Sequence, residues 1–382
     1  MLVVMTVLGI ETSCDETAAS VVVDGRRLLS NVVASSMDLH AKYGGVVPEI
    51  AARSHIESIM PVVQQALNEA FPALTSTNSV SDGVLAIAER RAKQWAEVDA
   101  IAVTYGAGLG GSLLVGVLTA RTLAIVYDKP LYAINHVEAH LYANFLTETA
   151  LPSYVLPSVQ PVFPSIGLIV SGGHSQLVHL RNHFDYTLLG QTNDDAIGEA
   201  FDKVAKIIGL PYPGGPSVSR KALDGNPQAF SLPKARMAGK YDFSFSGLKT
   251  AVLRLAQQQI GEDFTFPSSG LADRLNESQK ADIAASFQRV AVETVVDKTV
   301  LAYEEYGPRS VIIGGGVASS PELRRQLSQR LESRMGSPIL YTAPKLCTDN
   351  GAMIATLGCF KALHGQPTVD PYSLDIAPNL SM

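Results

Sequence analysis

The chain has 382 residues, of which 46% are hydrophobic and 17% are charged, and its net charge is −6 at neutral pH. These values exclude a disordered chain and a protein that binds polyanions over its whole surface, and the length predicts two lobes. The three cysteines, Cys14, Cys347 and Cys359, show no pairing pattern, which favours a reducing compartment. The first ten residues predict a strand and lack the basic segment of a signal peptide, so we expect a cytoplasmic protein.

Two stretches of the chain follow the same plan of a strand, a polar turn and a second strand. The first covers residues 9–23 and the second covers residues 165–180, where a β-branched run breaks at Ser171-Gly-Gly173. Glycine lets backbone N–H groups in such a turn approach an anion closely. The repeat predicts two similar lobes that face each other across a cleft.

The first turn concentrates hydrogen-bond acceptors and hydroxyl groups. Its members are Glu11, Ser13, Asp15, Glu16 and Thr17. Carboxylates in this arrangement can hold a cation near phosphate or orient water, although polar turn residues also serve simply to pair with the backbone. Residues 51–71 then show helical spacing, and residues 72–97 are expected to form a surface insertion.

An uncharged stretch at residues 100–120 has the length of a membrane span. Its glycines instead favour a strand at 98–104, a glycine-rich loop at 105–111 and a helix from Ser112 to about Tyr127. Free N–H groups and the helix dipole allow such a loop to bind an anion. The glycine spacing matches neither the P-loop nor the dinucleotide fingerprint.

His136 and His140 stand four residues apart in the next predicted helix. Both imidazoles therefore lie on one helix face and can reach a single metal ion. Asp349, expected just before a helix near the end of the chain, would complete a His₂-carboxylate set with open positions. Glu138 does not directly follow the first histidine as in the zincin motif, which argues against a metalloprotease. Two purely structural histidines are the alternative.

The second half of the chain opens with a Pro/Ser-rich linker at 148–164 and the second hairpin. Residues 191–209 predict a helix capped by Thr192, Asn193 or Asp194, and residues 278–306 predict a long amphipathic helix. Residues 200–255 hold nine Lys or Arg against three Asp, a local balance of +6 that could meet phosphates. A solvated surface is the alternative interpretation of this basic island.

Eight segments together resemble the bacterial tRNA N6-adenosine threonylcarbamoyltransferases. They are Gly9-Ile-Glu-Thr-Ser-Cys-Asp-Glu-Thr17, Tyr43-Gly-Gly-Val-Val-Pro-Glu49, His136-xxx-His140, Val170-Ser-Gly-Gly-His174, Gly198-Glu-Ala-Phe-Asp-Lys203, Tyr212-Pro-Gly-Gly-Pro216, Asp242-Phe-Ser-Phe-Ser-Gly-Leu-Lys249 and Cys347-Thr-Asp-Asn-Gly-Ala-Met353. The resemblance extends over residues 5–360 apart from the insertion. It implies an α/β, two-lobed fold of the actin/Hsp70/sugar-kinase superfamily with a central cleft. We expect an N-terminal lobe at 1–134, which contains the 72–97 insertion, and a C-terminal lobe at 135–382 whose last helix packs back on the first lobe.

The resemblance also implies an activity and its cofactor. Members transfer the threonylcarbamoyl group from L-threonylcarbamoyl-adenylate to N6 of adenosine 37 in tRNAs that read codons beginning with A. One divalent metal ion, usually iron, with zinc or magnesium as alternatives in purified protein, is held by the positions matching His136, His140 and Asp349. The adenylate-binding positions correspond to Ile169, Val170, Ser171, Gly172, Gly173, Asp202, Gly215 and Ser320. The family usually has asparagine at the position of Ser320.

The resemblance further implies partners, namely tRNA, a smaller paralogous subunit of the same superfamily and a P-loop ATPase. We expect Asp15 or Glu16 to act as the base or to organise water, and the Ser171–Gly173 turn to donate to substrate oxygens. We expect the basic island to contact the anticodon arm through residues such as Lys203 and Lys240. Two rival functions are a small-molecule kinase of the same superfamily and a nucleotide-binding scaffold without catalysis.

Overall fold

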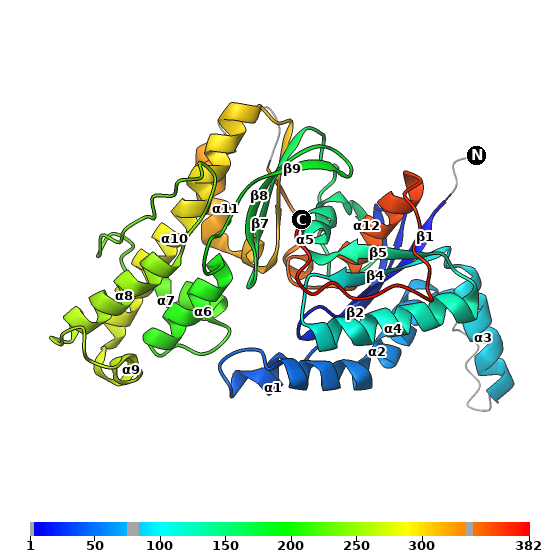
Figure 1. Cartoon of the computed structure of the whole chain (residues 1–382), viewed down its shortest axis with the longest axis horizontal. Coiled ribbons are helices and arrows are strands. Elements are labelled where there is room, and N and C mark those ends of the chain that lie inside the picture. Colours follow the sequence, from blue (N-terminus) through cyan, green and yellow to red (C-terminus); the bar gives the residue numbers. More distant parts are fainter. Residues whose placement is uncertain (1–3, 75–83, 333–338) are drawn as a thin grey trace. The chain divides into compact units, whose positions relative to one another are not determined.

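The computed structural model describes residues 4–74, 84–332 and 339–382 (Figure 1). The described residues form two compact units. The first unit draws on the described residues within 4–40, 46–160 and 348–382, and the second on those within 41–45 and 161–347. Each unit is built around a sheet of its own, with helices packed against it.

The sheet of the first unit has six strands in the order β5-β4-β1-β2-β3-β6. The strands are β1 (Thr6–Glu11), β2 (Glu16–Val23), β3 (Arg27–Ser35), β4 (Ala100–Gly106), β5 (Leu131–Asn135) and β6 (Glu148–Thr149). The first three form an antiparallel meander, and β4 pairs in parallel with both β1 and β5. Asp24 and Gly25 both have positive φ in the turn between β2 and β3, a conformation that Asp-Gly pairs readily adopt in hairpins.

Helices cover both faces of this sheet. The helices that contact its strands are α2 (Pro48–Ala70), α4 (Gly110–Tyr127), α5 (His136–Tyr142) and α12 (Gly351–Leu363), and the same part of the chain also forms α1 (Met37–Ala41) and α3 (Val84–Ala96). Leu8 and Ile10 of β1 are fully buried in a core shared with α2 and α4. Burying each of these side chains contributes roughly 1.5–3 kcal/mol. Side chains alternate along a strand, so Gly9 faces the other side of the sheet, where α12 packs.

Two glycines allow α12 to lie directly on the sheet. A Cβ atom added to Gly9 would stand 2.3 Å from the backbone nitrogen of Ala355, and one added to Gly351 would stand 2.6 Å from the backbone nitrogen of Ser20. No side chain fits between these backbones, so helix and strands approach more closely than usual. The packing fixes where α12 begins, and therefore where Asp349 stands.

Helix α4 is the one described helix that is long and apolar enough to cross a membrane. It follows β4 and a glycine loop, as predicted, and its buried residues Leu113, Val117 and Ala120 face the sheet and α2. The 72–97 segment falls partly outside the described residues, at 75–83. Trp95 at the end of α3 is buried and stacks on Tyr127 at 4.1 Å, so this part of the segment contributes to the core.

The sheet of the second unit has five strands in the order β11-β10-β7-β8-β9. The strands are β7 (Ser165–Val170), β8 (Ser175–Asn182), β9 (Asp185–Gln191), β10 (Ser310–Gly314) and β11 (Leu340–Tyr341). Three antiparallel strands again adjoin a parallel pair, in the same relative order as β3-β2-β1-β4-β5 of the first sheet. The repeat predicted from the two hairpins is therefore confirmed in the topology of each unit.

The helices of the second unit pack together around α10. They are α6 (Ile197–Ile207), α7 (Gly214–Ala222), α8 (Ser246–Gln259), α9 (Leu271–Arg274), α10 (Glu277–Tyr306) and α11 (Pro321–Leu327). Helix α10 begins with a capping box formed by Asn276 and Gln279 and ends at Gly307 in the left-handed region. Both signals can be read directly in the sequence, and the predicted helix over 278–306 matches.

The compact units do not follow the expected lobe boundary at residue 134. Strand β5 ends at Asn135 and α5 follows at once on the same sheet, so the first unit continues to Gln160. The chain returns to the first unit at Thr348, and α12 packs on β1 and β2. The predicted cleft concerns the placement of one unit relative to the other and stays a prediction.

Candidate metal centre

Helix α5 presents the two predicted histidines of the first unit on one face. The chain leaves β5 at Asn135, whose Oδ1 accepts hydrogen bonds from the backbone N–H groups of Val137 at 2.9 Å and Glu138 at 3.3 Å. This N-cap starts the helix one residue before His136. The His136 and His140 rings lie 4.7 Å apart, edge to face, and both side chains are buried.

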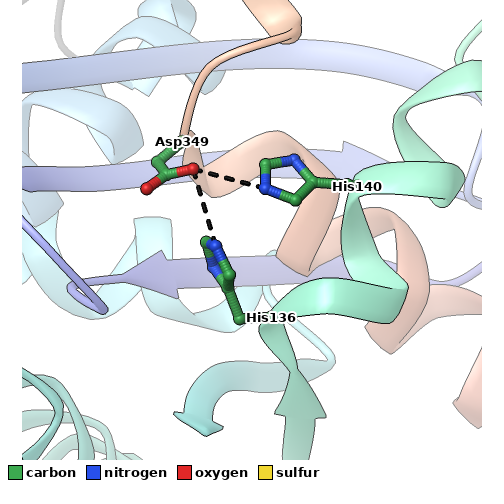
Figure 2. Close-up of side chains that lie close together, drawn as sticks. All are labelled: His136, His140 and Asp349. Atoms are coloured by element: carbon green, nitrogen blue, oxygen red, sulfur yellow. Dashed lines mark ion pairs between the residues drawn. The ribbon is translucent and has the colours of Figure 1, made fainter. Parts of the chain in front are cut away.

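Asp349 points at both imidazoles from the segment just before α12 (Figure 2). Its Oδ1 lies 3.6 Å from His136 Nε2 and 3.4 Å from His140 Nε2. The predicted convergence of two helical histidines with a carboxylate more than 200 positions later is present in the structure. Asn350 caps α12 by accepting from the backbone N–H of Met353, which leaves the carboxylate of Asp349 turned toward the histidines.

The three side chains fit a divalent metal ion. Their ligand atoms all lie within 4.8 Å of one another. Two ligands at about 2.1 Å from one ion, at angles of 90–109°, stand roughly 3.0–3.4 Å apart, close to the separations observed for Asp349. Two imidazoles and one carboxylate suit iron, zinc or manganese and leave coordination positions for water or substrate. The residues present therefore match the expected cofactor.

Glu11 orients His136 by contacting Nδ1, whereas the other ring nitrogen, Nε2, is the one near Asp349. The Oε2 atom of Glu11 lies 3.1 Å from His136 Nδ1, and Ser13 Oγ lies 3.1 Å from the same nitrogen. A histidine whose Nδ1 side is held by a carboxylate presents Nε2 to a metal, an arrangement common in metal sites. Sequence reasoning placed Glu11 in a general cluster of acceptors and missed this role. The available signal was an acid at the end of a strand that is apolar from Val7 to Ile10.

Electrostatics tie these groups together. Burial lowers the pKa of His136, but attraction to Asp349 and Glu11 outweighs it and raises the pKa to about 9. Burial raises the pKa of Glu11, but His136 and hydrogen bonds from Ser13 and Thr104 hold it below its ordinary value. Burial raises the pKa of Asp349 to about 6 despite the nearby His136. Without an ion, attraction to the two carboxylates keeps a proton on His136 at neutral pH.

The predicted base candidates lie on the turn between β1 and β2. Asp15 is buried and Glu16 is partly buried. Burial, followed by the negative charges of Asp349 and Asp15, raises the pKa of Glu16 to about 10. Glu16 therefore holds a proton at neutral pH in the absence of metal, so it is a weaker candidate for the base than Asp15.

Two fully buried histidines hold the backbone of this turn. His55 Nε2 lies 3.0 Å from the Cys14 carbonyl oxygen, and its Nδ1 lies 2.8 Å from Thr17 Oγ1. His40 Nδ1 accepts from the backbone N–H of Val47, and its Nε2 contacts Ser36, whose hydroxyl donates to the Asp15 carbonyl oxygen. The turn is thereby fixed relative to β3 and α2.

The sequence profile of the tRNA N6-adenosine threonylcarbamoyltransferase family matches residues 27–356. The chain belongs to this family. The threonylcarbamoyltransferase of Symbiobacterium thermophilum is 49% identical over 354 residues, which cover 93% of this chain and 91% of that protein. The threonylcarbamoyltransferase of Thermomicrobium roseum is 48% identical over 369 residues, which cover 94% and 93% of the two chains.

Two solved structures are similar to this chain in fold. HypF of T. kodakarensis has a TM-score of 0.51 at 13% identity, covering 94% of this chain and 48% of HypF. A full-length HypF in a phosphate- and nucleotide-bound form has a TM-score of 0.50 at 14% identity, covering 93% and 46% of the two chains. These likenesses concern the fold alone and agree with the predicted α/β fold.

The adenylate-binding positions expected of a threonylcarbamoyltransferase all lie in the second unit. Ile169 and Val170 end β7 with fully buried side chains, so any contact they make with a ligand goes through the backbone. The backbone N–H of Ser171 donates to the His174 carbonyl oxygen at 2.8 Å and is thus used within the turn. Gly172 and Gly173 are exposed, and a Cβ atom on either would meet nothing within 4 Å.

The remaining expected positions lie on or beside helices of the second unit. Asp202 on α6 accepts from the backbone N–H of Gly214 at 2.6 Å, and burial raises its pKa. Gly215, in the first turn of α7, has open space where a Cβ would stand. Ser320 caps α11 by accepting from the backbone N–H of Leu323 at 3.4 Å. Serine at this position is therefore sufficient to cap α11.

Proposed function

We propose that this chain transfers the threonylcarbamoyl group of L-threonylcarbamoyl-adenylate to N6 of adenosine 37 in tRNAs that read codons beginning with A. The observation that supports this most strongly is the family match over residues 27–356. The cluster of His136, His140 and Asp349 supports the proposal further, because neither a small-molecule kinase nor a nucleotide-binding scaffold would account for it.

The donor is a mixed anhydride, so its leaving group, AMP, is already good. The main tasks are to position N6 of adenosine against the carbonyl carbon and to accept the proton that N6 loses. Positioning alone can lower a barrier by roughly 7–11 kcal/mol in well-oriented cases. A divalent ion held by His136, His140 and Asp349, iron in most members, would supply Lewis acidity.

The chain's own residues have separate roles in this proposal. Glu11 keeps His136 Nε2 directed at the metal position, because it holds the opposite nitrogen. Asp15 accepts the proton from N6, directly or through a water molecule. Gly172, Gly173 and Gly215 let the adenylate approach the backbone of the second unit, because their Cβ positions face open space. In this proposal Asp202 accepts hydrogen bonds from the nucleotide.

We further propose a cytoplasmic location and two protein partners. A smaller paralogous subunit and a P-loop ATPase assist the bacterial members that the sequence resembles. The proposed metal ligands and the proposed base all belong to this chain. A single turnover with preformed adenylate should therefore depend on this chain. The ATPase and the subunit should then affect repeated turnover more than the first turnover.

The test mixes the purified chain, L-threonylcarbamoyl-adenylate and unmodified tRNA, with and without the partners, and follows the modified nucleoside by mass spectrometry. We expect threonylcarbamoyladenosine to form, and to be lost in Asp349→Ala. His364→Ala, which removes an exposed imidazole beyond α12, should react like the parent. Phosphorylation of a carbohydrate by ATP without any modified nucleoside would replace the proposal by the kinase alternative.

A further inference from the structure

The residues that follow α12 run as a C-terminal strap, residues 366–382, over the first unit. The backbone N–H of Val369 donates to the Leu131 carbonyl oxygen of β5 at 2.9 Å. The guanidinium group of Arg121 on α4 then donates to three strap carbonyls, those of Pro371 at 2.5 Å, Tyr372 at 2.7 Å and Leu374 at 3.1 Å. One side chain thus fixes the path of the strap.

The far part of the strap lies on the glycine loop between β4 and α4. The backbone N–H of Ala377 donates to the Tyr105 carbonyl oxygen at 2.7 Å, and the N–H of Gly108 donates to the Pro378 carbonyl oxygen at 3.1 Å. A Cβ atom on Gly106 would stand 2.1 Å from the Ala377 carbonyl oxygen. The contact therefore requires glycine at this point of the loop.

The last contact of the strap reaches the start of α5. Asn135 Nδ2 donates to the Ser381 carbonyl oxygen at 3.0 Å. The other end of the same amide, Oδ1, caps α5 by accepting from Val137 and Glu138. One buried side chain thus joins the strap to the helix that bears both histidines, one position before His136.

We propose that the C-terminal strap is a positioning element for the metal ligands and acts through Asn135. Helix α5 has seven residues, so it has little stability of its own, and its cap and packing set its orientation. Holding the Asn135 amide from the strap side fixes the cap, and the cap fixes the direction of His136 and His140. This inference rests on the metal site of the proposed transferase.

Two variants test the role of the strap separately from its contribution to folding. Asn135→Ser keeps a capping oxygen for α5 but is too short to donate to Ser381. A chain shortened after Ile376 removes the contacts to Tyr105, Gly108 and Asn135 together. The readouts are Zn²⁺ affinity, by competition with a chromophoric chelator, and hydrogen exchange of the α5 amides in metal-free protein.

We expect each variant to bind Zn²⁺ about tenfold more weakly, as for other outer partners of metal ligands, and α5 to exchange faster. Asn135→Ser in the shortened chain should cause no further loss, because both changes break the same connection. Tyr372→Ala, a strap residue whose side chain is 72% exposed, should bind like the parent.

Several outcomes would overturn the strap's role. Unchanged Zn²⁺ affinity in Asn135→Ser and in the shortened chain would do so, as would losses that multiply when the two changes are combined. Both results would leave the transferase proposal intact, because that proposal is tested by nucleoside formation. If His140→Ala bound Zn²⁺ as tightly as the parent, both the metal site and the strap's role would be overturned.

Discussion

Glu11 depends on the fold for its role more than any other residue near the metal centre. It ends β1 fully buried, and its partner His136 lies 125 positions later in the chain. The sequence shows an acid in a polar turn, whereas the structure shows a carboxylate that holds one imidazole nitrogen. The i, i+4 spacing of His136 and His140 was visible in the sequence because both residues share one helix. The pairing of Glu11 with His136 was not visible, because the two residues lie on different elements far apart in the sequence.

Metal affinity should depend on pH through His136. Its pKa of about 9 means that the metal-free site holds a proton below that pH, and this proton must leave when the ion binds. Affinity for Zn²⁺ should therefore rise by roughly tenfold per pH unit between pH 7 and 9 and then level off. Chelator competition across this range measures it.

Glu11→Gln provides the matched variant for this pH profile. It keeps the shape of the side chain but removes a charge that raises the pKa of His136, so the affinity should level off at a lower pH. A profile that is flat from pH 7 to 9 in the parent would contradict the proton on His136. Identical profiles in the parent and Glu11→Gln would show that Glu11 does not raise the pKa of His136.

Asp15 and Glu16 should separate in single-turnover experiments with bound adenylate. Asp15→Asn is expected to slow transfer by about 10²- to 10⁴-fold, the usual range for loss of a general base. Glu16→Gln should retain more of the rate than Asp15→Asn, because burial raises the pKa of Glu16 and so disfavours the charged carboxylate that a base requires. Equal rates for Asp15→Asn and the parent would rule out Asp15 as the base.

At the scale of elements, α12 brings Asp349 to the histidines because two glycines let it lie on the sheet. Gly9→Ala should lower the free energy of unfolding by about 1–3 kcal/mol or more, since the added methyl group meets the backbone of Ala355. The displacement of α12 should also lower metal content. Thermal unfolding and elemental analysis measure the two effects.

Gly45→Ala is the control for this substitution, because a Cβ at Gly45 would meet nothing within 4 Å. It should melt like the parent and keep its metal. If Gly9→Ala unfolded at the parent's temperature with full metal content, the close seating of α12 would not be what places Asp349.

Sequence patterns correctly predicted several of the helices and strands. Alternation and glycine breaks predicted both hairpins, and the capping residues at 276–279 mark the start of α10. The cap expected for α6 at residues 192–194 was wrong, because α6 begins after Ala196 without a side-chain cap. Asp194 instead accepts from the backbone N–H groups of Phe245 and Ser246 at the start of α8. Such a distant use of a capping residue cannot be seen locally.

More than half of the cations in the basic island, residues 200–255, are paired with acidic side chains. Five of its nine cations form ion pairs with acids outside the island or beside it: Lys203, Lys221, Lys234, Lys240 and Lys249. Most of the acids come from α10, which follows the island in sequence, so a local charge count overstated the positive field. Lys203 and Lys240, the expected tRNA contacts, are therefore weaker candidates than the exposed Lys206 and Arg236.

Charge reversal at Lys206 and Arg236 should weaken tRNA binding. We expect the slope of log affinity against log salt to fall in magnitude by about 2, because two phosphate contacts are lost. The matched control reverses Arg91 and Lys93 on α3, which are exposed and lie outside the island. Filter binding at several salt concentrations measures both pairs. Equal slopes for the island variant and the parent would exclude this surface from tRNA contact.

We propose that His136, His140 and Asp349 together hold one divalent ion. Anomalous diffraction at the iron absorption edge, from crystals of the iron-loaded protein, tests it most directly. We expect one peak about 2.0–2.3 Å from the Nε2 atoms of both histidines and from one carboxylate oxygen of Asp349. An iron-loaded crystal with its anomalous peak at other residues, or with none at these three, would contradict the account.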